Sequence, residues 1–241
     1  MIVSSTLPAG WVPRAVFFDL DDTLCDYAGA RRERLRHAFL QTGDPRLAGL
    51  PVAAMNELIS RSIALHPHGV DHFPELLTAE GVGDQEAHAR AMTWYRTHRF
   101  HGLALFPDAV RVVAATRCDD RGRCRPVGVI TNGPADVQRA KLNLLGVEGI
   151  VDFTLVSGEF GVGKPDPAIF GEALRRAGVP PADSLMVGDT LEYDVAGAGA
   201  SGVRSAWLHA GDGRRGPGQP VPDATITELA DVLTLIGGKV P

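Results

Sequence analysis

Five short apolar segments alternate with segments of helical pattern, and this alternation limits the folds open to the chain. Each apolar segment has the length of a strand, and the segments between them are long enough to form helices. Alternating strands and helices are typical of an α/β fold, in which helices cover a parallel sheet. The apolar segments lie at 15–19, 126–133, 153–158, 184–189 and 203–209, and the helical ones at 107–117, 135–146, 167–179 and 227–236.

The stretch from 25 to 105 departs from this alternation. It contains helix-like segments such as 31–40 and 53–65, and nothing in it resembles a core strand. An all-helical stretch that follows the first strand directly indicates a separate small domain. We therefore expect a Rossmann-like parallel-sheet core formed by residues 1–24 and 106–241, with an all-helical cap domain, residues 25–105, inserted in it.

The composition excludes some classes of function. The chain of 241 residues has 24 basic and 29 acidic residues, and its net charge of −5 argues against non-specific nucleic-acid binding, which needs a basic surface. No apolar run approaches the roughly 20 residues of a membrane span. The first dozen residues lack the basic segment of a signal peptide. We expect a cytoplasmic protein, a monomer or a homodimer, with neither nucleic-acid nor membrane partners.

The three cysteines are few and odd in number, which is typical of a reducing compartment. Cys118 and Cys124 bracket a hydrophilic loop. Closure of a small ring under oxidation and a two-cysteine metal site are the less favoured alternatives, so we expect unpaired loop thiols. Cys25 is expected to be a small packing residue.

Polar residues follow the ends of the apolar segments. In open parallel sheets, ligands bind outside the carboxyl ends of the strands. Carboxylates gathered at this edge would repel one another unless their charge were neutralised, and Mg²⁺, a hard cation that takes oxygen ligands, would neutralise it together with a lysine. Such a site has room for a further anion, for which a phosphoryl group is suited. The residues concerned are Asp19, Asp21, Thr131, Asn132, Lys164, Asp189 and Asp194.

Four ordered motifs resemble those of the haloacid dehalogenase superfamily. They are Asp19-Leu20-Asp21-Asp22-Thr23, Thr131-Asn132-Gly133, Lys164-Pro165, and Gly188-Asp189 with Asp194 five residues after Asp189. The helical insertion is similar to the C1 cap of subfamily I. The resemblance implies a Mg²⁺-dependent phosphatase that hydrolyses a small phosphorylated metabolite through an aspartyl-phosphate.

The resemblance also implies a role for each residue. Asp19 would attack phosphorus, and Asp21 would protonate the leaving oxygen and then deprotonate water. The carboxylates of Asp19 and Asp189 and the backbone carbonyl of Asp21 would hold Mg²⁺. Thr131 and Lys164 would bind phosphoryl oxygens, assisted by the backbone of Leu20 and Asn132. Asp194 would orient Lys164 or a metal-bound water, and Asp22 would be structural.

Other activities within the resemblance stay open. A sugar-phosphate mutase would share all four motifs, although Thr23 stands where such mutases usually carry glycine. A 2-haloacid dehalogenase would need neither Mg²⁺ nor the acid at position 21. A non-catalytic binding protein would be expected to have lost at least one of the catalytic residues.

The sequence of the helical insertion does not identify the substrate. Nucleoside monophosphates, phosphoglycolate and acylneuraminate phosphates are the classes that the resemblance implies. His66, His68 and His72 are expected to be polar loop residues, and the loop 66–73 is a candidate for substrate contact. The basic segment 31–36 is expected to be a solvated helix face, with contact to a second substrate charge as the alternative.

Overall fold

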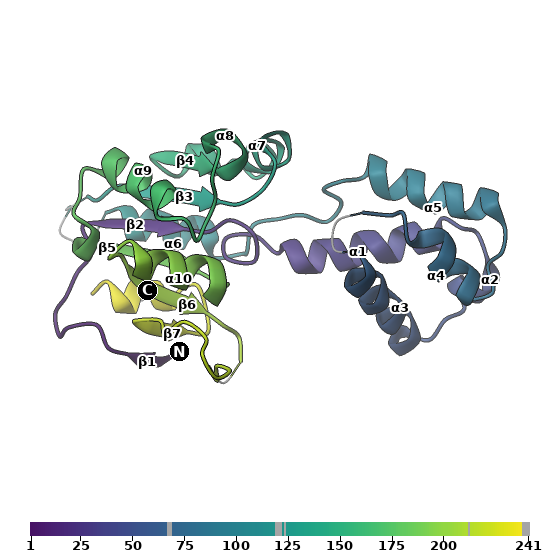
Figure 1. Ribbon diagram of the computed structural model, residues 1–241, viewed down its shortest axis with the longest axis horizontal. Helices are drawn as coiled ribbons and strands as arrows, with labels where there is room; N and C mark the ends of the chain where they lie inside the picture. Colours follow the sequence, from purple (N-terminus) through teal and green to yellow (C-terminus); the bar gives the residue numbers. More distant parts are fainter. Residues whose placement is uncertain (67–68, 119–121, 123, 212, 238–241) are drawn as a thin grey trace. The chain divides into compact units, whose positions relative to one another are not determined.

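The computed structural model describes residues 1–66, 69–118, 122, 124–211 and 213–237. It has a seven-stranded sheet and a set of helices (Figure 1). The strands are β1 (Ile2–Ser5), β2 (Ala15–Phe18), β3 (Val127–Thr131), β4 (Phe153–Val156), β5 (Ser184–Gly188), β6 (Arg204–Leu208) and β7 (Ala224–Ile226). The α-helices are α1 (Tyr27–Leu40), α2 (Pro45–Ala48), α3 (Val52–Leu65), α4 (Phe73–Ala79), α5 (Gln85–Thr97), α6 (Ala109–Arg117), α7 (Ala135–Leu144), α8 (Ser157–Phe160), α9 (Pro167–Ala177), α10 (Ala196–Ala200) and α11 (Asp231–Leu235). The π-helix η3 (Leu191–Val195) and two short 3₁₀ turns, η1 (Val147–Gly149) and η2 (Pro181–Asp183), complete the fold.

The chain divides into two compact units. Residues 1–26 and 104–241 form the α/β unit, and residues 27–103 form the helical unit. The α/β unit with an inserted set of helices confirms the Rossmann-like fold expected from the sequence.

The sheet of the α/β unit has the order β1-β7-β6-β5-β2-β3-β4, and only β1 runs antiparallel to its neighbour. β2 therefore lies between β5 and β3, to both of which it is parallel. All four residues of β2 are buried, as expected for a strand covered on both faces. The carboxyl ends of β5, β2 and β3 are consequently neighbours.

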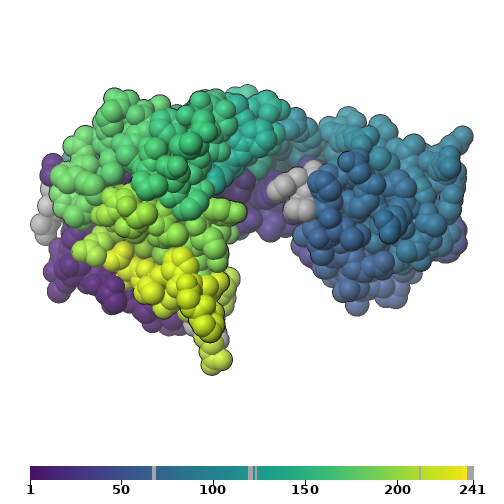
Figure 2. All heavy atoms as spheres, viewed as in Figure 1, coloured from purple at the N-terminus to yellow at the C-terminus, as the bar shows by residue number. Residues whose placement is uncertain are grey.

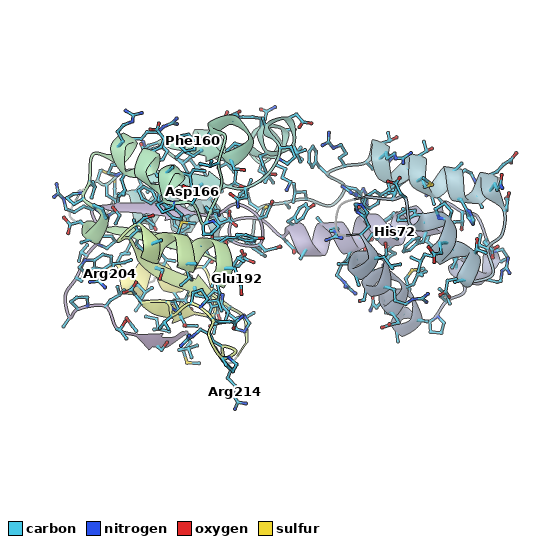
Figure 3. The ribbon with its side chains drawn as sticks, in the orientation of Figure 1. His72, Phe160, Asp166, Glu192, Arg204 and Arg214 are labelled. Carbon is cyan, nitrogen blue, oxygen red and sulfur yellow. A yellow bond between two sulfur atoms is a disulfide. The ribbon has the colours of Figure 1, made fainter. Side chains whose placement is uncertain are left out.

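One face of the sheet packs on α9 and α10. Phe17, Ile130 and Met186 project from three strands into a cluster that also contains Ile169 and Phe170 of α9. Asp166, labelled in Figure 3, begins α9 because its carboxylate accepts a hydrogen bond of 2.8 Å from the backbone N–H of Ala168. This cap fixes α9 directly after the segment that carries Lys164.

The helical unit has a hydrocarbon core of its own. Phe39, Phe73 and Tyr95 pack ring against ring, with centroids 5.1 Å apart for the first pair and 5.6 Å for the second. Leucines of α1, α3 and α4 surround them. Figure 2 shows one face of this unit, largely in blue, as a continuous surface of atoms.

The structure corrects the prediction for Cys118 and Cys124, which are joined by a disulfide. Their Cα atoms are 4.1 Å apart because the two residues form an isolated antiparallel bridge after α6. The prediction of unpaired loop thiols is therefore wrong. Cys25 is a buried free thiol. No helix among the described residues has both the length and the apolar character required to cross a membrane.

Candidate active site

Three adjacent strand ends bring the predicted site residues together. Asp19 follows β2, Thr131 is the last residue of β3, and Asp189 follows β5. A cavity of about 170 Å³ opens at these ends. It is lined by Asp19, Asp21, Asp22, Thr131, Asn132, Lys164, Asp189, Thr190, Tyr193 and Asp194. Every predicted site residue except the buried Leu20 lines this cavity.

Lys164 lies between two buried carboxylates. Its Nζ is 2.6 Å from Asp19 Oδ1 and 2.7 Å from Asp194 Oδ1. Lys164 is 4% exposed and Asp194 only 1%. Charge-assisted hydrogen bonds of this length in a buried setting hold the ammonium in one place. Lys164 therefore presents a fixed positive charge beside the carboxylate of Asp19.

The pKa values of these groups follow from burial and from one another. Burial raises the pKa of Asp19 to about 8, although the charge of Lys164 acts in the opposite direction. Burial also opposes the charge of Lys164, but Asp19 and Asp194 outweigh it and hold the lysine pKa above its usual range. Burial, with the charges of Asp194 and Asp22, raises the pKa of Asp189 to about 6. The cavity is lined by five carboxyl groups and one lysine, so negatively charged groups outnumber positive ones there.

Asp194 reaches the cavity from the π-helix η3. Its second oxygen, Oδ2, accepts a hydrogen bond of 3.0 Å from the backbone N–H of Thr190. Gly188 is required here because a Cβ atom at that position would lie 2.3 Å from the Asp194 carboxylate. A single π-turn inside a helix is a frequent feature of functional sites. The glycine and the π-turn together place Asp194 behind Lys164.

Three carboxylates could hold a metal ion. Oxygen atoms of Asp19, Asp189 and Asp194 all lie within 4.8 Å of one another. An all-oxygen donor set suits a hard cation such as Mg²⁺. The excess negative charge in the cavity fits the same interpretation. The residues present therefore fit the expected metal.

The side chain of Asn132 forms two hydrogen bonds with the backbone of Lys164. Its side-chain amide donates to the carbonyl of Lys164 over 2.8 Å, and its Oδ1 accepts from the Lys164 backbone N–H over 2.9 Å. Gly163 allows this approach, since a Cβ atom there would lie 2.5 Å from Asn132 Oδ1. The side chain of Asn132 therefore joins the end of β3 to the lysine segment.

A tight turn after β2 places Asp21. The carbonyl of Leu20 accepts hydrogen bonds from the backbone N–H groups of Leu24, over 2.9 Å, and Cys25, over 3.1 Å. Asp22 has a φ of +57°, a left-handed conformation that aspartate tolerates better than most residues, and its N–H donates to the carbonyl of Cys25. This turn gives Asp22 a structural position.

Two residues of α7 reach the site without having been predicted. Lys141 Nζ is 2.7 Å from Asp21 Oδ2 and 2.9 Å from Asp21 Oδ1. Gln138 Nε2 is 2.5 Å from Thr131 Oγ1. Both residues are buried, on the same face of the helix as Leu142. Polar side chains at the buried positions of an amphipathic helix were the available signal.

The histidines and the basic segment lie in the helical unit. His72 Nε2 is 2.6 Å from Ser62 Oγ, and its ring stacks on that of His66. Pro67 and His68, part of the candidate loop 66–73, fall outside the described residues. Within the segment 31–36, Arg32 is hydrogen-bonded to the carbonyl of Asn56.

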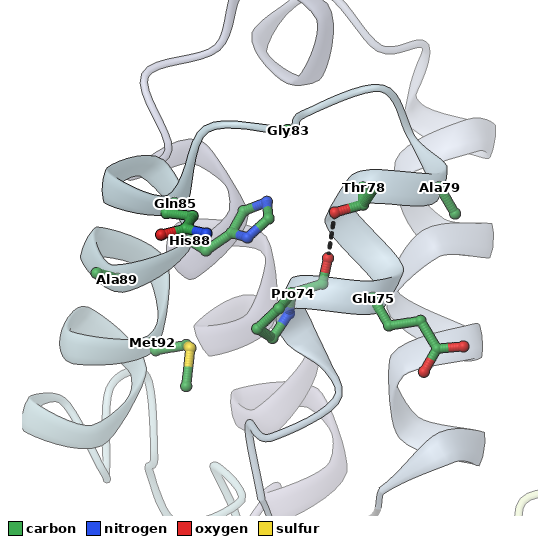
Figure 4. A pocket seen from close by; sticks show the side chains of 9 residues that line it. All are labelled: Pro74, Glu75, Thr78, Ala79, Gly83, Gln85, His88, Ala89 and Met92. Carbon is green, nitrogen blue, oxygen red and sulfur yellow. Dashed lines mark hydrogen bonds between the residues drawn. The ribbon is translucent and has the colours of Figure 1, made fainter.

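A larger cavity, of about 770 Å³, lies between α4 and α5 (Figure 4). Pro74, Thr78 and Met92 are among its lining residues. His88 also lines it, with its Nε2 placed 2.6 Å from the carbonyl oxygen of Val82. Its lining residues gather no cluster of charged groups comparable with that at the strand ends.

Known proteins are similar to this chain in sequence and in fold. Residues 13–202 match the family model of the haloacid dehalogenase-like hydrolases. A phosphoserine phosphatase from Thermus thermophilus is 36% identical over 161 residues, a match that spans 67% of this chain and 62% of that protein. A glyceraldehyde 3-phosphate phosphatase from Methanopyrus kandleri is 31% identical over 92% of this chain and 97% of its own length.

A solved structure is also similar. The 2-haloacid dehalogenase from Pseudomonas syringae pv. tomato DC3000 is 32% identical, with a TM-score of 0.56 over 93% of this chain and 98% of that one. The family model spans well over half of the present chain and covers all four motifs. This chain belongs to the haloacid dehalogenase-like hydrolase family.

Proposed function

We propose that this hydrolase removes the phosphoryl group from a small phosphorylated metabolite, with Mg²⁺ as cofactor and Asp19 as nucleophile. The observation that carries the proposal is the buried Asp19 carboxylate, held by Lys164 at the meeting point of three strand ends. The presence of an acidic side chain at Asp21, two residues later, supports phosphoryl transfer. Relatives that are phosphoserine and glyceraldehyde 3-phosphate phosphatases support the substrate class.

The first half of the reaction uses Asp19 and Asp21. An oxygen of Asp19 bonds to phosphorus as the bond between phosphorus and the ester oxygen breaks. Asp21 gives its proton to that leaving oxygen. Lys164 and Thr131 stabilise the charge spread over the phosphoryl oxygens.

The second half regenerates the enzyme. Asp21 takes a proton from water while the water oxygen bonds to phosphorus and the Asp19–phosphorus bond breaks. Inorganic phosphate then leaves. Asp19 and Asp189, with Asp194 at the rear of the cavity, would hold Mg²⁺, which supplies positive charge to the phosphoryl oxygens when bound.

The experiment is phosphate release from a panel of phosphorylated metabolites, with Mg²⁺ and with chelator. The panel includes phosphoserine, glyceraldehyde 3-phosphate, nucleoside monophosphates and sugar phosphates. Wild type is compared with Asp19→Asn and with Asp183→Asn, the same change at a partly exposed residue just before β5. We expect metal-dependent release that Asp19→Asn abolishes and Asp183→Asn leaves intact.

A dehalogenase is the second candidate, because a structure of that activity is 32% identical to this chain. Chloride release from 2-chloropropionate without Mg²⁺, together with no phosphate release from any compound, would replace the phosphatase by a dehalogenase. Isomer formation without phosphate release would instead indicate a mutase.

A further inference from the structure

We propose that Lys141, assisted by Gln138, is a positioning residue that fixes the carboxyl group of Asp21 for proton transfer to the leaving group. This inference rests on the proposed function. Neither residue belongs to the four motifs at the strand ends. Both come from α7, which follows β3 and lies beside the cavity.

The contacts of Lys141 engage both oxygens of Asp21. The distances from Nζ are 2.9 Å to Oδ1 and 2.7 Å to Oδ2. Lys141 is 3% exposed, whereas the side chain of Asp21 is 24% exposed and lines the cavity. An ammonium that bonds both oxygens restricts rotation of the carboxyl group. The open side of Asp21 therefore faces the cavity in a fixed orientation.

Gln138 joins this pair to the expected phosphate site. Its Nε2 is 2.5 Å from Thr131 Oγ1 and 3.4 Å from Asp21 Oδ2. The second contact is long for a hydrogen bond, so the first dominates. Cys25 adds a weak thiol contact, with Sγ 3.7 Å from Asp21 Oδ1. The amide of Gln138 thus holds the threonine that would bind phosphoryl oxygen and lies beside the proposed acid.

The choice of lysine rather than arginine at position 141 supports a specific role for the side chain. The chain has 24 basic residues, of which only Lys141, Lys164 and Lys239 are lysines. Lys239 lies outside the described residues, and the other two are both buried against carboxylates of the cavity. An ammonium is a compact point charge that fits where the planar guanidinium does not. Lysine is therefore used where a carboxylate of the cavity must be held within a confined space.

The ion pair of Lys141 and Asp21 is not explained by a contribution to folding stability alone. A buried ion pair loses hydration on both groups and contributes little net stability compared with apolar residues of similar size. Lys141 and Gln138 also occupy the buried face of α7, where Leu142 shows that hydrocarbon is accommodated. If the ion pair instead serves proton transfer by Asp21, removing Lys141 should slow the reaction most for substrates whose leaving group needs a proton.

The test compares two substrates with Lys141→Met. The conjugate base of p-nitrophenol leaves without protonation, whereas an alkoxide leaves only as it gains a proton. The value of kcat/KM reports the steps up to formation of the aspartyl-phosphate. We expect kcat/KM for the best alkyl phosphate to fall about 10- to 100-fold, as for other residues that orient a catalytic group, and kcat/KM for p-nitrophenyl phosphate to change less than about threefold.

Two further variants keep the test decisive. Arg139→Gln, which removes a half-exposed ion-pairing residue from the same helix, should leave both values unchanged. In an Asp21→Asn background, Lys141→Met should cause little additional loss, because the two residues act as a unit. If Lys141→Met misfolds, Lys141→Gln replaces it, with the same selective loss expected.

An equal fall for both substrates, or no change in either, would overturn the positioning role while leaving the phosphatase intact. Absence of phosphate release by wild type from every compound would instead remove the proposed function, and this inference with it. A conservative Lys141→Arg variant that restores the full rate would contradict the need for a compact ammonium.

Discussion

The two units of this protein bury different kinds of side chain. The helical unit buries aromatic and aliphatic groups, and its buried residues Thr42, Ser62 and His88 are hydrogen-bonded within the unit. Thr42, for example, donates to the carbonyl of Phe39 over 2.7 Å. The α/β unit also has an apolar core, but it buries Asp19, Lys141, Lys164 and Asp194 beside its cavity.

This difference separates residues that stabilise the fold from residues whose burial the proposed reaction would explain. Apolar burial contributes directly to folding, whereas buried charge costs hydration that ion pairs recover only in part. Burial raises the pKa of Asp19 and so disfavours its charged form, although Lys164 acts in the opposite direction. We therefore expect substitutions in the two units to have opposite consequences for stability and activity.

The largest effect is expected from Asp19→Asn. Loss of the nucleophile should lower phosphate release by about 10⁴-fold or more. Because burial already disfavours the charged form of Asp19, its replacement by a neutral amide of similar size should leave the melting temperature the same or raise it. Activity assays and calorimetry measure the two effects. A large loss of stability would mean that Asp19 supports the fold and would weaken the contrast between the units.

The next effect is expected in the helical unit. Phe73 is fully buried, so Phe73→Ala should lower the free energy of unfolding by about 3–5 kcal/mol through lost contacts and a residual cavity. Urea titration measures this loss. The control is Phe160→Ala in the α/β unit, where the residue is 38% exposed and the expected loss is smaller, about 1 kcal/mol. Similar values for both would contradict the assigned core.

Mg²⁺ should stabilise the α/β unit. At a concentration 100 times its dissociation constant, a ligand that binds only the folded state adds about 2.7 kcal/mol. We expect Mg²⁺ to raise the melting temperature, chelator to reverse the rise, and Asp189→Asn to reduce it. The same rise in Asp189→Asn as in wild type would place the ion elsewhere.

The smallest effect concerns His72. Burial lowers its pKa below the usual 6.5, and the charge of His66 acts in the same direction. The folded state therefore favours the neutral ring. Its contribution to stability is fully present above pH 6.5, and it is lost as the pH falls from 6.5 through the folded-state pKa. The decrease in melting temperature between pH 7 and pH 5 should be smaller in His72→Gln, and an unchanged decrease would contradict this contribution.

The central strands were predictable because both faces of each strand are covered. β2 to β6 appear in the sequence as short apolar runs, and three of the five, β2, β3 and β5, end at or just before a site residue. β1 and β7 were not predicted. Three of the four residues of β1 are exposed, and β7 has only three residues, so neither has a distinctive pattern.

The gathering of the candidate site residues at one cavity was predictable where those residues lie close together in sequence. Asp19 with Asp21, and Gly188 with Asp189, are short motifs at strand ends. The pairing of Lys141 with Asp21 joins residues 120 positions apart, and only the folded chain shows it. The disulfide of Cys118 and Cys124 depends in the same way on how the loop after α6 closes.

The most direct measurement of the central claim is the location of the phosphoryl group during turnover. The protein is mixed with p-nitrophenyl phosphate and Mg²⁺, quenched in acid, and its peptides are mapped by mass spectrometry, with Asp19→Asn as the control. The account predicts a phosphoryl group on Asp19 in wild type and none in the variant. Turnover with no phosphoryl group on Asp19, or with one on another residue, would contradict it.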